Sequence, residues 1–161
     1  MKLKRKHWPL LTLVGIVIVL GGVFVFKKVA ILQLKNMDHP RAMSIRISPS
    51  EQFSMFYIHS IYKEPVIEEF QAEDGAIVLK GVRSKSPAVM EYYGFEDMKG
   101  FHPLNQKLGA IYFKWGMGEG QGLIVRGRKI YLSEVGERGD RIQLRVESIS
   151  LGYYLFSVIF K

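Results

Sequence analysis

Hydrophobic and polar positions divide this chain into one long uncharged apolar run and a later part in which apolar residues come in short, interrupted groups. The apolar run covers residues 8–26. It is flanked by basic side chains, namely Lys2, Lys4, Arg5 and Lys6 before it and Lys27 and Lys28 after it. At about 1.5 Å per residue, a helix of this length reaches roughly 28 Å, close to the ~30 Å hydrocarbon core of a bilayer. Because a lone segment in lipid must satisfy its own backbone hydrogen bonds, we expect a single transmembrane helix over residues 8–26.

A cleaved signal peptide is the alternative interpretation of this basic and apolar start. The apolar run is longer than the apolar centre of a signal peptide, and a small-residue cleavage pattern is missing, because Lys28 stands two positions before Ala30. We therefore expect an uncleaved anchor. The chain contains no cysteine, which excludes a lipid anchor on an N-terminal cysteine and any disulfide.

The flanking charges predict the orientation of the helix. More basic side chains precede it than follow it, and the more basic flank usually stays in the cytoplasm. We expect a single-pass protein of the cell membrane, with residues 1–7 as a cytoplasmic basic tail, residues 27–43 as a juxtamembrane linker and residues 44–161 as an extracytoplasmic β domain.

The pattern after residue 43 is mostly that of strands, with short runs rich in Val, Ile, Tyr and Phe between turn residues. We expect strands near residues 44–48, 53–62, 66–72, 76–83, 109–115, 122–126, 129–133, 141–148 and 152–160. Between them, Ser86 as N-cap, Pro87 at the first helical position and Gly94 at the end predict one short helix. The predicted fold class is all-β, a small antiparallel β-sandwich or barrel with one short helix, preceded by the transmembrane helix.

The net charge of +8 suggests a nucleic-acid-binding protein until the chain is divided. Seven of the 23 Lys and Arg residues lie in residues 1–35, which contain no acidic residue, and residues 36–161 carry 16 basic and 15 acidic groups. A nearly neutral domain does not release counterions from phosphates, so nucleic acid is not an expected partner. The one basic cluster of the domain, Arg126–Lys129, contains a glycine and is typical of a hairpin tip.

The segment Phe53–Phe70 holds the candidate chemistry. Strand alternation places His59 on an apolar face. If the chain reverses symmetrically at Lys63 and Glu64, His59 faces Glu68 across the ladder, within hydrogen-bonding reach, whereas a loop of another length changes the partner of His59. Such a pair has two interpretations: a structural pair that satisfies two buried polar groups, or a carboxylate that orients an imidazole toward a ligand or metal.

Catalytic motifs are not recognised in this sequence. Ser60 follows His59 directly, and neighbouring strand residues point to opposite faces, so His59 is badly placed to activate the hydroxyl of Ser60. No catalytic residue, metal site or cofactor is predicted. A run of alternating glycines forms a possible ligand loop between two strands: Gly116, Gly118, Gly120 and Gly122. Because this run does not lead into a helix, its backbone amides are a weak signal of anion binding, and a hairpin loop is the simpler interpretation.

The His59 segment also resembles the bacterial domain-of-unknown-function family 1850. In that family a strand ends in His-Ser and is followed by Pro-Val, a Glu and an aromatic residue at the steps found here for His59, Ser60, Pro65, Val66, Glu68 and Phe70. The resemblance extends more loosely over residues 44–160 and includes the membrane segment, although residues 84–95 depart from the family pattern. It implies an extracytoplasmic domain encoded beside fused permeases of tripartite ATP-independent periplasmic (TRAP) transporters that use the TAXI type of solute receptor. It implies no biochemical activity.

Three hypotheses about function follow from these observations. The first is a non-enzymatic accessory protein of a TRAP-type transporter, which contacts the permease or its solute receptor. The second is a structural or sensory protein of the cell envelope that uses its β domain as a docking surface. The third is a hydrolase or metal-dependent enzyme built around His59 and Glu68, which requires a solvent-accessible pocket at that pair.

Overall fold

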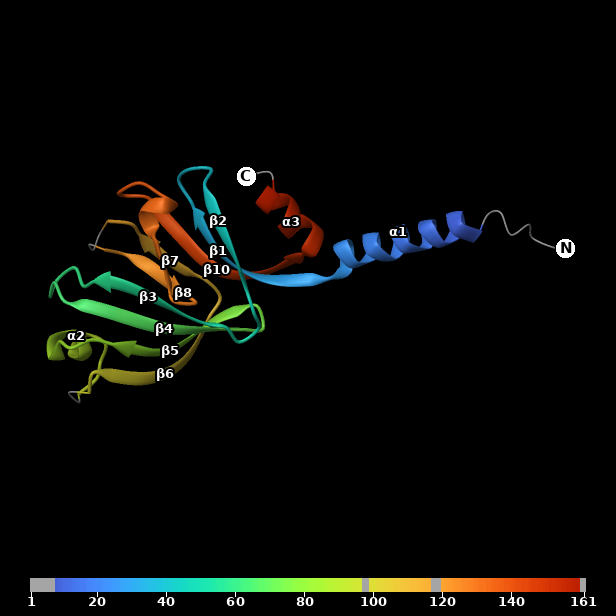
Figure 1. Ribbon diagram of the computed structural model, residues 1–161. Coiled ribbons are helices and arrows are strands. Elements are labelled where there is room, and N and C mark those ends of the chain that lie inside the picture. The colour runs from blue at the N-terminus through green and yellow to red at the C-terminus, as the bar shows by residue number, and fades with distance from the viewer. Residues whose placement is uncertain (1–7, 97–98, 117–119, 160–161) are drawn as a thin grey trace. The chain divides into compact units, whose positions relative to one another are not determined.

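The computed structural model describes residues 8–96, 99–116 and 120–159. The predicted basic tail, residues 1–7, lies outside these residues. Along the chain the elements are α1 Trp8–Phe26, β1 Lys28–Asn36, β2 Ala42–Ile47, β3 Gln52–Ile58, β4 Pro65–Glu73, β5 Ala76–Arg83, α2 Pro87–Tyr92, β6 Phe101–Leu108, β7 Ile111–Lys114, β8 Gly122–Val125, β9 Arg128–Tyr131, a 3₁₀ turn Leu132–Glu134, β10 Arg141–Ser150 and α3 Leu151–Ile159 (Figure 1). The described residues form two compact units, one from residues 8–29 and 148–159 and the other from within residues 30–147.

The first unit contains α1 and α3. Helix α1 covers the whole predicted span, has no buried residue and is long and apolar enough to cross a membrane. A helix of this length and composition near an N-terminus serves as a membrane anchor or as a signal sequence. The predicted N-terminal helix is therefore confirmed.

The second unit is an antiparallel β domain with two sheets, which confirms the predicted fold class. The order of strands is β2-β1-β10-β7 in sheet A and β6-β5-β4-β3-β8-β9 in sheet B. Both sheets contribute to one hydrophobic cluster, for example Leu34 and Leu144 from sheet A and Phe53 and Leu123 from sheet B. In Figure 1, β3 to β6 lie together below β1, β2 and β10. The shared cluster between facing sheets is the arrangement of a small sandwich.

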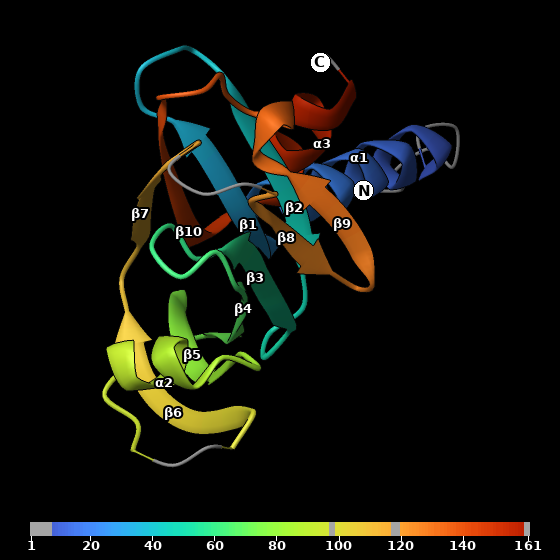
Figure 2. The same ribbon diagram turned by 90° about the vertical axis from the view of Figure 1, so that its left-hand side faces the viewer.

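The short helix and the basic hairpin tip are where the sequence predicts them. Ser86 caps α2, since its side chain accepts a hydrogen bond from the backbone N–H of Val89, and Gly94 beyond the helix has a φ of +82°. A second hydrophobic cluster joins α2 to β5 and β6, beside which it lies in Figures 1 and 2. Arg126 and Gly127 connect β8 to β9 with φ angles of +51° and +74°, as a tight hairpin turn requires.

The predicted linker, residues 27–43, is wrong, because it contains strand β1. This strand lies in the interior of sheet A, between β2 and β10, and Val29, Ile31, Leu32 and Leu34 are all buried. A strand buried on both faces loses the alternation of apolar and polar residues. Its sequence therefore resembles a continuation of the apolar run in front of it.

Two further elements differ from the prediction. The sequence pattern does not predict strand β6, because it is an edge strand, where a proline and several polar residues such as Asn105 and Gln106 are tolerated. The last predicted strand, residues 152–160, is wrong: after Ser150 the chain forms the helix α3. Its Tyr, Val and Ile content favours a strand, but the hydroxyl of Ser150 accepts a hydrogen bond from the backbone N–H of Tyr153 and so caps a helix.

Candidate functional site

The predicted pairing of His59 with Glu68 is wrong. Strands β3 and β4 pair in a register that places Ile58 opposite Pro65 and Met55 opposite Glu68. The chain reverses through four residues, 60–63, and the backbone N–H of His59 donates to the carbonyl of Glu64 at 2.8 Å. Lys63 completes the turn with a φ of +56°. The chain therefore reverses between residues 61 and 62, two residues before the predicted position at Lys63 and Glu64, and this changes the partner of every residue in β3.

His59 organises its own loop. The side chain is 6 % exposed, and its Nδ1 accepts hydrogen bonds from the backbone N–H groups of Ile61 and Tyr62, at 3.4 Å each. The ring stacks on Tyr62 with a centroid distance of 5.1 Å and meets the edge of Tyr92 at 4.8 Å. These contacts explain why a four-residue loop forms here, and they use the imidazole for structure.

Glu68 pairs instead with two tyrosines. One of its carboxylate oxygens accepts a hydrogen bond from Tyr57 at 3.1 Å and another from Tyr93 at 2.7 Å, and the two hydroxyls also contact each other. Burial, together with the neighbouring Glu68 carboxylate, raises the pKa of both tyrosine hydroxyls well above the usual value. We call this group the tyrosine cluster. Tyr93 lies at the end of α2. The residue patterns of β3 and β4 do not predict where α2 packs, so they do not predict this contact.

The remaining residues of the motif have separate environments. Ser60 is exposed in the loop, and Pro65 is exposed at the start of β4, where its carbonyl accepts a hydrogen bond from the Ser84 hydroxyl at 2.9 Å. Val66 is 1 % exposed and belongs to the hydrophobic cluster under α2. The structure therefore does not bring the motif together around one cavity.

The glycine run divides into positions with different surroundings. Gly118 lies outside the described residues. Gly122 begins β8, where a Cβ would lie 2.4 Å from the carbonyl oxygen of Ile130 and 2.6 Å from the ring of Phe56, so this glycine is required by close packing. Gly116 and Gly120 both have positive φ and line a cavity of about 330 Å³.

This cavity, which we call the Trp115 cavity, is also lined by side chains that the sequence analysis did not select: Trp115, Gln121, Tyr131, Ser133 and Arg138. Arg138 lies along Gly116, where an added Cβ would come within 2.5 Å of Cγ of Arg138. Across the described residues, the Arg138 guanidinium makes no hydrogen bond or ion pair. The cavity therefore combines two aromatic rings, a hydroxyl, an amide and an available cation.

A smaller and more apolar cavity of about 150 Å³ shares Gln121 with the Trp115 cavity. Its other lining residues are Met55, Tyr57, Phe113 and Leu132. Tyr57 thus contributes both to this cavity and to the tyrosine cluster. Mostly apolar walls with few polar groups are typical of small-molecule pockets.

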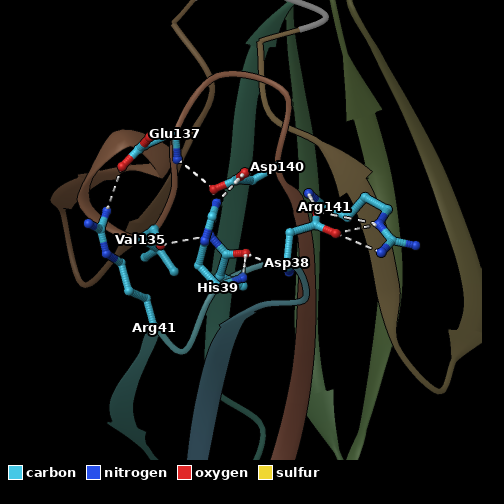
Figure 3. Close-up of polar contacts among 8 residues, drawn as sticks. Asp38, His39, Arg41, Val135, Glu137, Asp140 and Arg141 are labelled. Carbon is cyan, nitrogen blue, oxygen red and sulfur yellow. Dashed lines mark hydrogen bonds and ion pairs between the residues drawn. The ribbon is translucent and has the colours of Figure 1, made fainter.

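A buried polar cluster lies around Asn36, at the end of β1. Figure 3 labels residues that surround it, among them Asp38, Val135 and Asp140. The amide of Asn36, a residue 2 % exposed, donates to a carboxylate oxygen of Asp140 at 2.7 Å and to the carbonyl of Val135 at 3.3 Å. Its side-chain oxygen accepts from the backbone N–H groups of Asp38 and His39 at 2.8 and 2.9 Å. We call this group the Asn36 cluster; it joins the β1–β2 loop to the loop before β10.

Asp140 and Asp38 both carry depressed pKa values in this region. The backbone N–H of Glu137 and the Asn36 amide bond to the Asp140 carboxylate and lower its pKa. Asp38 binds the guanidinium and the backbone N–H of Arg141, with a shortest distance of 2.6 Å, and these bonds lower the pKa of Asp38 to about 2 (Figure 3). Both carboxylates are therefore ionised and bonded in the folded state.

Metal binding has no candidate in the part of the chain that the structure describes, where no three His, Cys, Asp or Glu side chains come together in a group that could hold an ion. No model of a known protein family, no characterised protein and no solved structure matches this chain. The resemblance at the His59 segment therefore stays a prediction from the sequence.

Proposed function

We propose that this protein is a non-enzymatic accessory of a TRAP-type transporter of the TAXI kind, held at the membrane by α1. Three observations support the proposal. Helix α1 is long and apolar enough to span a bilayer, it leads into β1 through Lys27 alone, and the β domain contains a formed cavity lined by aromatic rings, a serine and an arginine. The resemblance of residues 59–70 to domain-of-unknown-function family 1850 supplies the transporter as the partner class.

The proposed orientation places the β domain outside the cytoplasm. The flank before α1 carries four basic side chains and the amino terminus, which favours its retention on the cytoplasmic side. A domain in this position is accessible to a solute receptor and to the outer loops of a permease.

The chemistry of the candidate residues supports binding. The imidazole of His59 is engaged with its own loop, and Glu68 accepts hydrogen bonds from two tyrosines, so the pair on which an enzyme hypothesis rests is not assembled. The Trp115 cavity offers the opposite arrangement, because its Arg138 and Ser133 have no protein partner among the described residues. Aromatic rings beside an arginine are the side chains most enriched at the energetic centre of protein interfaces.

Photo-crosslinking in the native membrane tests this proposal. A photoreactive amino acid at Tyr131, which is 45 % exposed at the rim of the Trp115 cavity, is compared with the same amino acid at Lys107, which is exposed on β6 at the opposite edge of sheet B. Captured proteins are identified by mass spectrometry after mild solubilisation. We expect a TRAP-type permease or its solute receptor from Tyr131 and not from Lys107.

Other results would change the proposed function. Capture of envelope proteins alone from Tyr131 would contradict the transporter role and favour the envelope docking protein. Equal capture of the transporter from both positions would keep the partner and contradict the Trp115 cavity as the contact site.

A further inference from the structure

Helix α3 carries no charged side chain. Residues 148–159 contain no Asp, Glu, Lys or Arg. Tyr153, Phe156 and Ile159 are spaced by three residues, so they form one stripe along the helix, and they are 64 %, 60 % and 71 % exposed. A helix at a protein–water boundary normally presents charged or polar residues on such a stripe, whereas this stripe presents large, mostly apolar side chains.

The start of α3 is bonded to the end of α1. The backbone N–H of Leu151 donates to the carbonyl of Lys27 at 2.8 Å. Gly152 approaches the backbone of Phe24 so closely that a Cβ there would lie 3.1 Å from the carbonyl oxygen. Phe24 is two residues from the end of α1, a rise of about 3 Å, so the contact is at one end of the apolar span. Figures 1 and 2 both show α3 beside this end of α1.

We infer that α3 is a second membrane-binding element, which lies in the outer interface of the bilayer beside the point where α1 leaves it. Nine residues rise about 14 Å, too short to cross the hydrocarbon core, so α3 lies at the interface and does not span it. Tyrosines at this depth are favourable, because an aromatic ring with a hydroxyl suits the headgroup region. The occupant of the exposed stripe is lipid, since α3 begins in contact with the end of the apolar helix α1.

Both membrane elements are continuous with strands of the β domain. Strand β1 follows α1 after one residue, and strand β10 leads directly into α3. These two strands are neighbours in sheet A. This inference rests on the proposed membrane anchoring by α1, and its test separates the two.

Depth-dependent fluorescence quenching tests the inference on the full-length protein. The chain has no cysteine, so each variant carries a single thiol for an environment-sensitive fluorophore. Ile159→Cys reports on the end of α3, Val17→Cys on the middle of α1, and Lys107→Cys on the exposed edge strand β6. The proteins are reconstituted in vesicles of phosphatidylethanolamine and phosphatidylglycerol, and quenching by aqueous iodide is compared with quenching by lipids brominated at shallow or deep positions. Tyr153→Cys, on the same stripe, is a second α3 position in case the first label perturbs the helix.

We expect iodide to quench the Ile159 label several-fold less than the Lys107 label, and shallow brominated lipids to quench the Ile159 label more than deep ones do. The Val17 label should be quenched best by the deep lipids. Iodide quenching at Ile159 and Tyr153 equal to that at Lys107, with Val17 in lipid, would overturn the role of α3 and leave the anchor in place. Protection of both α3 labels from iodide and from lipid would show a protein cover and also overturn the inference. Failure of deep lipids to quench the Val17 label would overturn the anchor itself, and the inference with it.

Discussion

The Asn36 cluster and the Trp115 cavity share one loop, but they differ in whether their polar side chains are hydrogen-bonded. In the cluster, the side chain of Asn36 makes four hydrogen bonds, and both the amide and its partner Asp140 are buried. In the cavity, the guanidinium of Arg138 and the hydroxyl of Ser133 make none within the described residues. Arg138 and Asp140 are two residues apart in the loop before β10.

The difference indicates a division of roles within this loop. Buried polar groups with all partners present hold the chain in one conformation, and their loss leaves unsatisfied groups. Trp115 is linked to the same loop, since its backbone N–H donates to the carbonyl of Asp140 at 2.8 Å and its carbonyl accepts from Gly139 at 2.9 Å. The Asn36 cluster therefore positions the loop, whereas two polar side chains of the Trp115 cavity, Arg138 and Ser133, make no hydrogen bond within the described residues.

The largest expected effect comes from the Asn36 cluster. Asn36→Ala removes four hydrogen bonds and leaves the buried Asp140 carboxylate short of a donor, so we expect the free energy of unfolding to fall by about 2 to 3 kcal/mol. The measurement is denaturant unfolding in detergent, monitored by near-ultraviolet circular dichroism. Asn105→Ala, which removes an exposed amide that contacts Lys80, is the matched control and should stay within about 0.5 kcal/mol of the parent. Equal effects of the two substitutions would contradict the positioning role of the cluster.

The tyrosine cluster is an intermediate case, because its groups are satisfied but only partly buried. Tyr93→Phe removes one hydroxyl from Glu68 and should lower the unfolding free energy by about 1 kcal/mol. Tyr62→Phe is the control, since the Tyr62 hydroxyl has no hydrogen bond among the described residues. The result would be contradicted if both variants unfolded at the same denaturant concentration.

Alkaline pH provides a second measurement on the same cluster. The pKa values of Tyr57 and Tyr93 are raised in the folded state, so above about pH 10 the unfolded chain releases these protons while the folded protein retains them. Stability is fully present below that pH and falls as pH rises further. In Tyr93→Phe the alkaline loss should be smaller than in the parent, as measured by unfolding titrations between pH 9 and 11, and an equal loss would contradict the predicted linkage.

Acidic pH should produce a smaller loss of stability than alkaline pH, because the carboxylates involved are nearer to solvent. The pKa of Asp38 is lowered to about 2 by Arg141, and that of Glu51 is lowered to about 2 by Arg126, from ordinary values of 3.8 and 4.5. Depressed carboxylate pKa values give stability that is present above the ordinary pKa and is lost as pH falls toward 2. Asp38→Asn should flatten the decline between pH 4.5 and 2, and added salt should reduce the difference between variant and parent. Parallel declines in the two proteins would contradict the contribution of Asp38.

The sequence predicts the elements that depend on a local residue pattern. It does not predict features that depend on the length and position of loops or on contacts between distant residues. Alternation and turn residues place most strands, Ser86 predicts the helix cap, and residues 126–127 predict the hairpin tip. The predicted His59–Glu68 register is wrong because the chain reverses two residues earlier than predicted, in a loop to which the His59 side chain is hydrogen-bonded. The Trp115 cavity draws on residues from 115 to 138, and its members meet only through the packing of loops, so no spacing in the sequence marks them.

The difference between the Asn36 cluster and the Trp115 cavity predicts that substitution of Arg138 has almost no effect on stability and a large effect on binding. Its side chain is exposed and has no hydrogen-bonding partner among the described residues, so Arg138→Ala should change the unfolding free energy by less than about 0.5 kcal/mol. The same substitution should abolish capture of the transporter partner by a photoreactive amino acid at Tyr131. Arg128→Ala is the matched control, because it removes the same charge from exposed strand β9, which also carries Tyr131, without touching the lining of the cavity.

Three outcomes distinguish the explanations. Loss of capture in Arg138→Ala alone supports the Trp115 cavity as the contact, and Arg138→Lys then separates charge from geometry, because a lysine retains the charge but not the planar fork of donors. Equal losses in Arg138→Ala and Arg128→Ala indicate a general attraction of the basic edge of sheet B, in which the cavity has no special part. Undiminished capture in both variants contradicts a binding role for the cavity. The side chains of Arg138 and Ser133 would then be ordinary solvated surface groups.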